Sequence, residues 1–397
     1  MLTNEQKRVI IDNMITQLEL PDFAYEKAKN RYEDLGDWFD REESTVKDYH
    51  PHIFSQGSFR LGTAIRPIDE TEEYDLDLAC KLRGGIAKGT HTQEHLKRVV
   101  GEELETYRSC RAIQKRLEAK HRCWRLEYKD DLSFHMDIVP CIPAGKNRRN
   151  MIFESMRQSG VEEHIASSAS QTTVNITDDR NEGYKNICED WHISNPEGYA
   201  SWFEYRMNTT RRIAILEKAQ VDDVPLFQRK TPLQKIIQLL KRHRDNMFKG
   251  DEDVKPISII ITTLAARAYN GEHDIVIALE NILESMEKFV NRTLPRVPNP
   301  VDPQEDFADR WAMSKYRTLN LEKNFGNWLK QIKIDFQHIT TQSDTQFITK
   351  QFEQKFSITV NKTELAKQLG ISAATASVII PKSHAIERKH SAKPWKR

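Results

Sequence analysis

The chain has 397 residues, enough for two or three domains of about 150 residues and for a large buried core. Apolar residues make up 38% and charged residues 30%, a balance that predicts a folded protein and excludes an intrinsically disordered one. The 60 lysines and arginines face 59 acids, so the net charge of +1 excludes attraction to long nucleic acid or to an anionic membrane through overall charge.

The cysteines and the N-terminus predict a cytoplasmic protein. The five cysteines are scattered, with no CxxC pair and no zinc-ligand spacing, which is typical of reduced thiols. The first residues carry no basic-then-apolar signal segment. The longest apolar stretch, 257–266, falls well short of the roughly 20 residues of a membrane span, so we expect no membrane partner.

Two amphipathic helices are predicted at the start of the chain. Thr3 and Gln6 fit a capping box, and apolar residues then recur at helical spacing as far as Leu18. Pro21 restarts the pattern, with apolar residues on one stripe as far as Phe39. We expect this helical N-terminus to brace the domain that follows.

A glycine-containing segment follows, SQGSFRLGTAIRP, in which we predict a phosphate-binding loop at Gly57 and Ser58. A glycine backbone can approach phosphate oxygens closely, and a serine hydroxyl can donate a hydrogen bond to them. The loop comes just before a predicted strand, so it can hold the triphosphate of a nucleotide near that strand.

The predicted strand is YDLDLACKL, in which Asp75 and Asp77 share one face while Leu76 and Leu78 share the other. Two carboxylates two residues apart on a strand have Cα atoms about 7 Å apart and can share hard cations. Their mutual repulsion raises the pKa of at least one of them until a cation binds. This pair predicts a Mg²⁺ site.

A third acid, Asp137, lies in the later strand-like run FHMDIVP. Alternation places Asp137, His135 and Val139 on one face, and a neighbouring strand could bring Asp137 beside the first two aspartates. Three acids on adjacent strands can hold two Mg²⁺ ions, with Mn²⁺ as a substitute, in the clamp used for in-line phosphoryl displacement. For His135 the pattern indicates a packed or supporting strand residue and no catalytic role.

The chain changes character after about residue 150. Residues 150–195 are polar and weakly periodic, which indicates an irregular, lid-like insertion. From Pro196 onward helices dominate, and Lys241 lies at the edge of an apolar helix face from which it could turn toward β- and γ-phosphates. The last sixteen residues are basic and aperiodic, so we expect a mobile tail. We therefore divide the chain into a catalytic lobe (1–195), a helical nucleotide-binding lobe (196–340) and a C-terminal extension (341–397).

The motifs GSFRLGTAIRP, YDLDL and FHMDIVP, in this order, resemble the signature of the DNA polymerase beta nucleotidyltransferase superfamily. GTAIRP, NPEGYASWF and the helical second lobe are similar to the bacterial cyclic-oligonucleotide synthases called CD-NTases, which are related to cyclic GMP-AMP synthase and oligoadenylate synthase. The resemblance extends from about residue 50 to 330.

The resemblance implies an α+β bilobed fold, with a mixed-sheet palm lobe braced by N-terminal helices and a helical C-terminal lobe. It implies that ATP or GTP, or both, are joined into a cyclic di- or trinucleotide for antiphage signalling. Carried onto matching positions, Asp75 and Asp77 hold both metals, and Asp137 completes one metal site and accepts the proton of the attacking hydroxyl. Ser58 contacts the γ-phosphate of the donor, and Lys241 and Ser258 resemble the family's other triphosphate contacts.

The resemblance also concerns partners. It implies a monomer that works with regulatory or effector proteins of a bacterial defence operon. The chain lacks the Cys/His zinc spacing of the vertebrate enzymes, so no long nucleic acid is expected as a partner.

Two other functions remain open from the sequence. The same palm occurs in template-independent transferases that add nucleotides to RNA or protein, and these require a primer. A catalytically silent nucleotide sensor is the other alternative, and it predicts the loss of at least one acid, whereas all three are present here.

Overall fold

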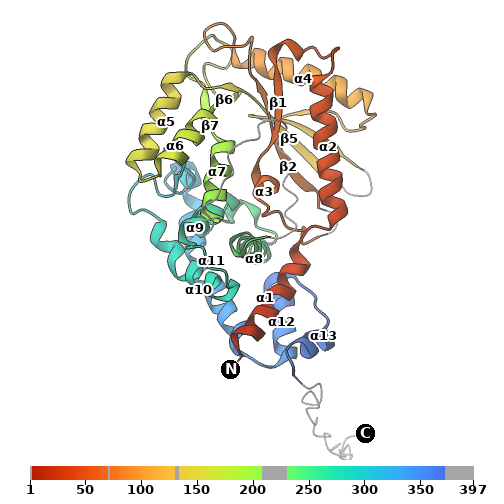
Figure 1. Ribbon diagram of the computed structural model, residues 1–397, viewed down its shortest axis with the longest axis vertical. Helices are drawn as coiled ribbons and strands as arrows, with labels where there is room; N and C mark the ends of the chain where they lie inside the picture. Colours follow the sequence, from red (N-terminus) through yellow and green to blue (C-terminus); the bar gives the residue numbers. More distant parts are fainter. Residues whose placement is uncertain (1, 70–71, 130–133, 208–229, 372–397) are drawn as a thin grey trace, which may run out of the picture.

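The computed structural model describes residues 2–69, 72–129, 134–207 and 230–371. It has two lobes, one built on a sheet and the other on helices, which lie above and below one another in Figure 1. The predicted α+β, bilobed fold is confirmed.

A mixed seven-stranded sheet forms the first lobe. Its two central strands run parallel to each other, and each is flanked by an antiparallel neighbour. In their order across the sheet the strands are β1 (Pro51–Ser55), β2 (Tyr74–Leu82), β5 (Phe134–Pro143), β4 (Trp124–Tyr128) and β3 (Glu118–Ala119), with β6 (Val174–Ile176) and β7 (His192–Ser194) paired beyond one end of β5. The parallel pair brings together the two strands that carry the predicted aspartates.

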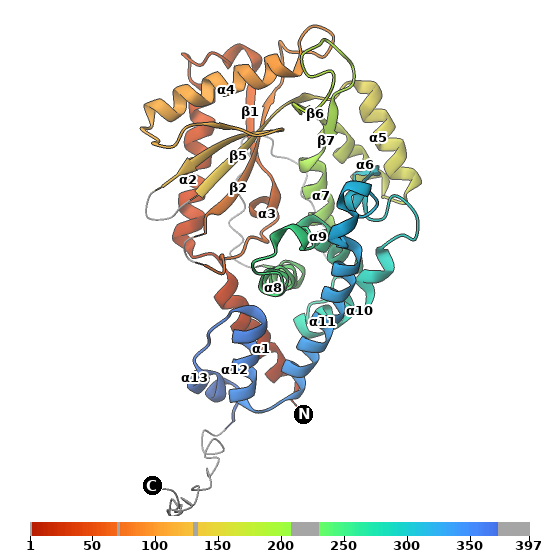
Figure 2. The ribbon, with the colours of Figure 1, turned by 180° about the vertical axis from the view of Figure 1, so that it is seen from behind.

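One face of the sheet is covered by two helices, α2 (Asp22–Asp40) and α4 (Gln93–Cys110), as Figures 1 and 2 show. Leu76, Leu78 and Met136 are fully buried in the core between these helices and the sheet. Because successive strand residues point to opposite faces, the residues between them face the other side of the sheet. That side is therefore free of this core and available for a site.

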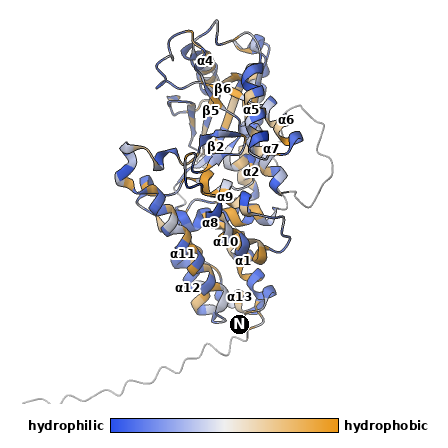
Figure 3. Ribbon diagram, turned by 90° about the vertical axis from the view of Figure 1, so that its left-hand side faces the viewer, coloured by the Kyte–Doolittle hydropathy of each residue, from blue (hydrophilic) through white to orange (hydrophobic). Residues whose placement is uncertain are grey.

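The helical lobe is organised around α8 (Pro232–Met247), which is buried along most of its length. Its start is fixed as the sequence predicts, because Thr231 and Gln234 form a capping box ahead of Pro232. Figure 3 shows hydrophobic residues gathered in the interior of both lobes and hydrophilic residues on the outer turns of the helices. The helices packed around α8 are α1 (Asn4–Leu18), α9 (Ser258–Ala268), α10 (Ile275–Ser285), α11 (Leu321–Thr341) and α12 (Thr345–Phe356), with α13 (Lys362–Gln368) against α1 and α12.

The two N-terminal helices belong to different lobes. The capping box of Thr3 and Gln6 is confirmed at the start of α1. Yet α1 buries Ile11 and Met14 in the core of the helical lobe. Of the two N-terminal helices, only α2 covers the sheet. The N-terminal segment therefore ties the two lobes together as well as bracing the first.

Residues 150–195 are regular in their first part, so the prediction of an irregular insertion is wrong there, whereas residues 177–191 contain neither helix nor strand, as predicted. They include most of α5 (Lys146–Gln158) and all of α6 (Glu163–Gln171), followed by β6 and β7. The sequence gives little periodic signal because α5 buries only Ile152 and Met156 along its thirteen residues.

The remaining described elements are short turns, one further helix and a small hairpin. They are η1 (Lys47–Tyr49), α7 (Pro196–Met207), η2 (Glu252–Val254), η3 (Met286–Phe289), β8 (Pro298–Asn299), β9 (Asp302–Asp306), η4 (Asp309–Trp311) and η5 (Ser314–Leu319). Among the described residues, no helix has both the length and the apolar character needed to cross a membrane. The basic tail predicted over the last sixteen residues lies outside the described residues.

Candidate active site

The three predicted aspartates lie together on the sheet face opposite the α2 and α4 core. Asp75 and Asp77 alternate along β2 with buried leucines, and Asp137 on β5 is the register partner of Asp77. The Asp75 side chain is 55% exposed, whereas that of Asp137 is only 17% exposed. The strand pairing therefore creates a carboxylate cluster that is open to solvent on the side of Asp75.

The carboxylates in this cluster repel one another. Burial, and then the neighbouring charges of Asp75 and Asp137, raise the pKa of the Asp77 carboxyl to about 7. Nearby positive charge from His135 and Lys241 opposes this rise. A cation bound between the carboxylates would relieve the same repulsion, so the cluster is suited to a divalent metal ion.

Gly57 packs directly against the Asp77 carboxylate. Its φ is +64°, and a Cβ atom added to it would lie 2.1 Å from Asp77 Oδ2. Gln56 fastens this turn to β2, because its backbone N–H donates to Asp77 O at 2.9 Å and its side-chain amide donates to Leu78 O at 3.1 Å. Only glycine meets both the left-handed backbone and the close approach.

The predicted Gly-Ser loop is in fact the first turn of a short helix, α3 (Gly57–Arg60). Ser58 lies in this turn and lines a cavity of about 420 Å³ between the two lobes. The same cavity is lined by Asp75, Lys241 and Ser258. The structure thus brings together residues of α3, β2, α8 and α9 that are up to 200 positions apart in the chain (258 − 58).

Basic and acidic residues line this cavity in equal numbers. The basic residues are Arg66, Lys241, Arg244, Lys249 and Lys255, and the acids are Glu72, Glu73, Asp75, Asp245 and Glu252. A triphosphate carries several negative charges, and lysines and arginines hold phosphate oxygens by charge-assisted hydrogen bonds. The lysines and arginines, and the position of the cavity beside the aspartates, suit a nucleoside triphosphate.

Lys241 is buried and bridges the lobes. Its Nζ donates to Thr63 O at 3.1 Å and lies 3.4 Å from Thr63 Oγ1. Burial, and then the charge of Arg244, lower the pKa of Lys241 to about 8. The charges of Asp245, Asp77 and Asp75 oppose this lowering, and a phosphate group arriving in the cavity would add to their effect.

Ser258 is paired with a residue that the sequence reading missed. Arg244 Nη1 donates to Ser258 Oγ at 2.7 Å and to Pro256 O at 3.1 Å. Arg244 lies three positions after Lys241 on α8, and residues at this spacing share a helix face. That spacing was the available signal for adding Arg244 to the predicted triphosphate contacts.

Two further residues next to the aspartates were also missed or discounted. Arg125 on β4 binds Asp137 with two parallel bonds, Nε to Oδ1 and Nη2 to Oδ2, each of 2.7 Å. His135 Nε2 lies 3.0 Å from Asp75 Oδ1, and this hydrogen bond raises the pKa of the imidazole. The alternation that placed His135 beside Asp137 could have identified it, whereas Arg125 depends on the pairing of β4 with β5.

These residues fit a divalent cation. One ligand atom from each of Asp75, His135 and Asp137 lies within 4.8 Å of the others. Carboxylate oxygens are the ligands that Mg²⁺ prefers, and imidazole nitrogen suits transition-metal ions.

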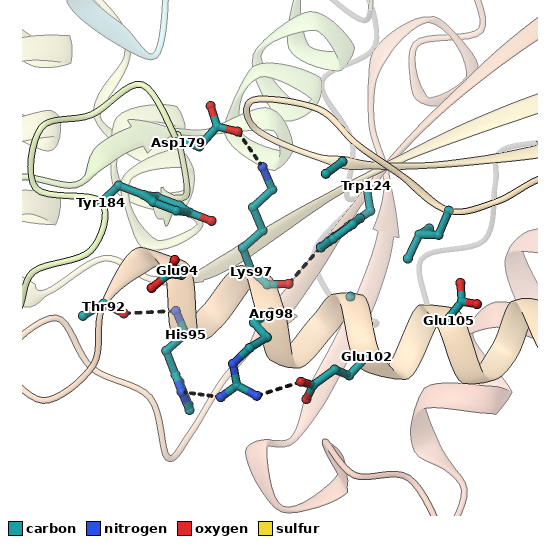
Figure 4. Close-up of a pocket in the computed structure, with 13 residues that line it drawn as sticks. Thr92, Glu94, His95, Lys97, Arg98, Glu102, Glu105, Trp124, Asp179 and Tyr184 are labelled. Carbon is teal, nitrogen blue, oxygen red and sulfur yellow. Dashed lines mark hydrogen bonds and ion pairs between the residues drawn. The ribbon is translucent and has the colours of Figure 1, made fainter.

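A second cavity, of about 790 Å³, lies along α4 on the outside of the sheet lobe (Figure 4). In it Lys97 pairs with Asp179 at 3.2 Å and Arg98 with Glu102 at 2.7 Å, much as Arg244 pairs with Asp245 at 2.6 Å in the first cavity. It contains none of the three aspartates. We therefore place the candidate nucleotide site in the cavity between the lobes.

Comparisons with known proteins agree with this geometry. Residues 51–140, from β1 into β5, match the family described as "Cyclic GMP-AMP synthase DncV-like, nucleotidyltransferase domain". The chain is 28% identical over 353 residues to a c-di-GMP synthase of Roseivirga ehrenbergii. The aligned region covers 85% of this chain and 82% of the relative. It is 22% identical over 330 residues to the cyclic dinucleotide synthase CdnG of Bradyrhizobium diazoefficiens, covering 77% and 70%. These matches identify a nucleotidyltransferase that is similar to the bacterial CD-NTases.

Solved structures of CD-NTases share the fold of this chain. CdnG of B. diazoefficiens, in complex with GTP, aligns with a TM-score of 0.62 and 18% identity over 92% of this chain and 98% of the other. Escherichia coli CdnC, solved with a HORMA protein, aligns with a TM-score of 0.55 and 11% identity. This alignment covers 88% of this chain and 96% of the CdnC chain. The two-lobed fold of these structures therefore extends over nearly the whole length of this chain.

We expect the activity of this enzyme to fall above pH 8 because Lys241 loses its charge. The pKa of Lys241 in the folded protein is about 8, below its ordinary 10.5, so deprotonation begins in an accessible range. The kcat/KM for nucleoside triphosphate, measured from about pH 6.5 to 9.5, should decline on the alkaline side. Lys241→Met should lower kcat/KM about tenfold at pH 7 and lose the decline.

Lys235→Met is the matched control for this prediction. Lys235 lies on the same helix but pairs with Asp12 at 3.3 Å, away from the cavity. Its substitution should leave both the rate and the pH profile unchanged. An alkaline decline that persists in Lys241→Met would assign it to another group.

Proposed function

We propose that this enzyme joins nucleoside triphosphates, ATP or GTP or both, into a cyclic di- or trinucleotide second messenger and releases pyrophosphate. The observation that carries the proposal is the convergence of Asp75, Asp77 and Asp137 beside a cavity that is lined by Lys241, Arg244 and three further basic residues. The activities for which the two relatives are named, synthesis of c-di-GMP and of a cyclic dinucleotide, support the cyclic product. A cytoplasmic role in antiphage defence completes the proposal.

The residues on the two sides of the cavity have different roles, one set binding the triphosphate and the other binding metal ions. Ser58, Lys241 and Ser258 hold the donor triphosphate from α3, α8 and α9, so that its α-phosphate faces the aspartates. Asp75 and Asp77 would hold two divalent ions, Mg²⁺ or in its place Mn²⁺, and bound ions would supply polarisation of the α-phosphate and of the attacking hydroxyl.

Asp137 accepts the proton of the acceptor ribose hydroxyl. The hydroxyl oxygen then bonds to the donor α-phosphorus, the bond to the β-phosphate oxygen breaks, and pyrophosphate leaves with its electron pair. Arg125 engages both Asp137 oxygens, but each carboxylate oxygen has two lone-pair directions, so a free one remains on each. A second transfer of the same kind, within the linear intermediate, closes the ring.

Partner proteins form part of the proposal. The structure of E. coli CdnC with a HORMA protein supports regulation of this enzyme by proteins encoded beside it. The net charge of +1 supports activation without long nucleic acid.

The test is incubation of the full chain with all four labelled triphosphates and Mg²⁺ or Mn²⁺, followed by phosphatase treatment and mass spectrometry. A phosphatase-resistant cyclic product, absent with the Asp75→Ala, Asp77→Ala double variant, is expected. Mass spectrometry fixes the bases and the ring size together. A requirement for an RNA or protein primer would favour the template-independent transferase, and nucleotide binding without turnover would favour the silent sensor.

A further inference from the structure

His135 occupies a place in the site that its packing alone does not explain. It pairs in register with Asp75 across β2 and β5, and it shares a strand face with Asp137 two positions later. Its side chain is only 16% exposed, yet it points among carboxylates instead of into the apolar core on the other face. The imidazole is therefore held within the acid cluster.

The distances around the ring match those of a metal ligand. Nε2 lies 3.0 Å from Asp75 Oδ1, and one atom from each of Asp75, His135 and Asp137 lies within 4.8 Å of the others. Adjacent ligand atoms on an octahedral ion with bonds of about 2.1 Å are about 3.0 Å apart. A small movement would let one ion contact all three residues, replacing the proton between Nε2 and Oδ1.

The other ring nitrogen faces a carboxylate. His135 Nδ1 lies 3.4 Å from Glu73 Oε2. Histidines that bind metals usually direct their second ring N–H to a carboxylate or a carbonyl, which fixes the tautomer and leaves the first nitrogen free to coordinate. Glu73 supplies that carboxylate, so Nε2 is the nitrogen that can bind an ion shared with Asp75.

We infer that His135 Nε2 is a direct ligand of one of the two divalent ions, beside Asp75 and Asp137, and that it selects Mn²⁺ and Co²⁺ over Mg²⁺. The inference rests on the proposed metal-dependent transfer and names a property of that same site. An imidazole nitrogen is a poor ligand for Mg²⁺, which prefers oxygen, and a better one for first-row transition ions. His135 therefore gives the site a preference for a transition-metal ion.

Pulsed electron paramagnetic resonance of the Mn²⁺-loaded full chain tests this directly. The sample contains inorganic tripolyphosphate, which occupies the phosphate cavity but has no nitrogen of its own. The spectrum should show coupling of Mn²⁺ to one imidazole ¹⁴N nucleus. His135→Gln and His135→Asn should abolish this coupling, weaken Mn²⁺ binding about tenfold and leave Mg²⁺ binding within about twofold.

His121→Gln is the matched control. His121 Nδ1 also faces a carboxylate, Asp179 Oδ1 at 2.7 Å, but it lies outside the acid cluster. Its substitution should change neither the coupling nor the affinity for Mn²⁺. Melting curves of both His135 variants show whether each is folded before its spectrum is read.

The outcomes separate this inference from the proposed function. Bound Mn²⁺ without ¹⁴N coupling, or coupling that persists in His135→Gln, would overturn the role of His135 alone. Mn²⁺ that binds equally well to the Asp75→Ala, Asp77→Ala variant would overturn the metal site on which the proposed function depends. Equal loss of Mg²⁺ and Mn²⁺ binding in the two His135 variants would reduce His135 to a residue that orients Asp75.

Discussion

Asp77→Asn is expected to abolish product formation and, at the same time, to raise the melting temperature of the metal-free protein. Asparagine has nearly the same shape but cannot supply the charge that holds the cations, so kcat should fall by at least about a thousandfold. Stability should rise because the variant removes a carboxylate that is partly buried beside Asp75 and Asp137. If Asp77 had a merely structural role, its substitution would lower both product formation and the melting temperature.

The pH dependence of this stabilisation follows from the sign of the shift. The folded-state pKa of Asp77, about 7, lies above its ordinary 3.8, so the folded protein holds the proton more tightly than the unfolded chain does. The wild type therefore loses stability as the pH rises from about 4 to 7. Asp77→Asn does not, and its advantage should reach about 1 to 3 kcal/mol above pH 7.

Calorimetry of both proteins at about pH 4.5 and 8, with and without Mn²⁺, measures this difference. Asp37→Asn, at an exposed position on α2, is the control and should change neither activity nor melting temperature. Mn²⁺ should stabilise the wild type and fail to stabilise Asp77→Asn. Equal melting temperatures at high pH would contradict the argument from carboxylate repulsion.

The aspartates could be found from the sequence because strand alternation is a local property. YDLDL and FHMDIVP each show which side chains share a face, and parallel pairing then needed only to put the two strands side by side. The residues that hold the aspartates in place were harder to find. Arg125 meets Asp137 only through the register of β4 on β5, and a register shifted by one residue would point Arg125 away.

Contacts between the lobes lay further beyond the sequence. Lys241 was identified as a cavity residue, but its partner Thr63 lies 178 positions away, and no periodicity links them. The first helix is a similar case, because its apolar stripe predicted that it packs on something without showing what. α1 packs on α8 and α10 of the helical lobe. Local pattern fixes an element, whereas its partner depends on tertiary packing.

Gly57→Ala is expected to impair both folding stability and catalysis, through its contact with Asp77. The added Cβ atom would lie 2.1 Å from Asp77 Oδ2, and the backbone at φ +64° already disfavours alanine. The left-handed backbone costs about 1 to 2 kcal/mol, and relief of the overlap should bring the total to about 2 to 4 kcal/mol. Activity should fall at least about a hundredfold, because the overlap displaces the Asp77 carboxylate.

Gly160→Ala is the control that separates the cost of a left-handed backbone from the cost of the overlap with Asp77. Gly160 has φ +82° and nothing within 4 Å of the position of a Cβ atom, so its substitution should cost only the backbone part and leave activity intact. A double-mutant cycle isolates the remainder: in an Asp77→Ala background the overlap with the carboxylate is gone and only the Cβ atom of residue 77 remains, at 3.2 Å, so Gly57→Ala should then cost little more than Gly160→Ala. Additive costs in this cycle would show that Gly57 serves the turn alone. A coupling of at least about 1 kcal/mol would show that the missing side chain at position 57 is what gives the Asp77 carboxylate its place in the site.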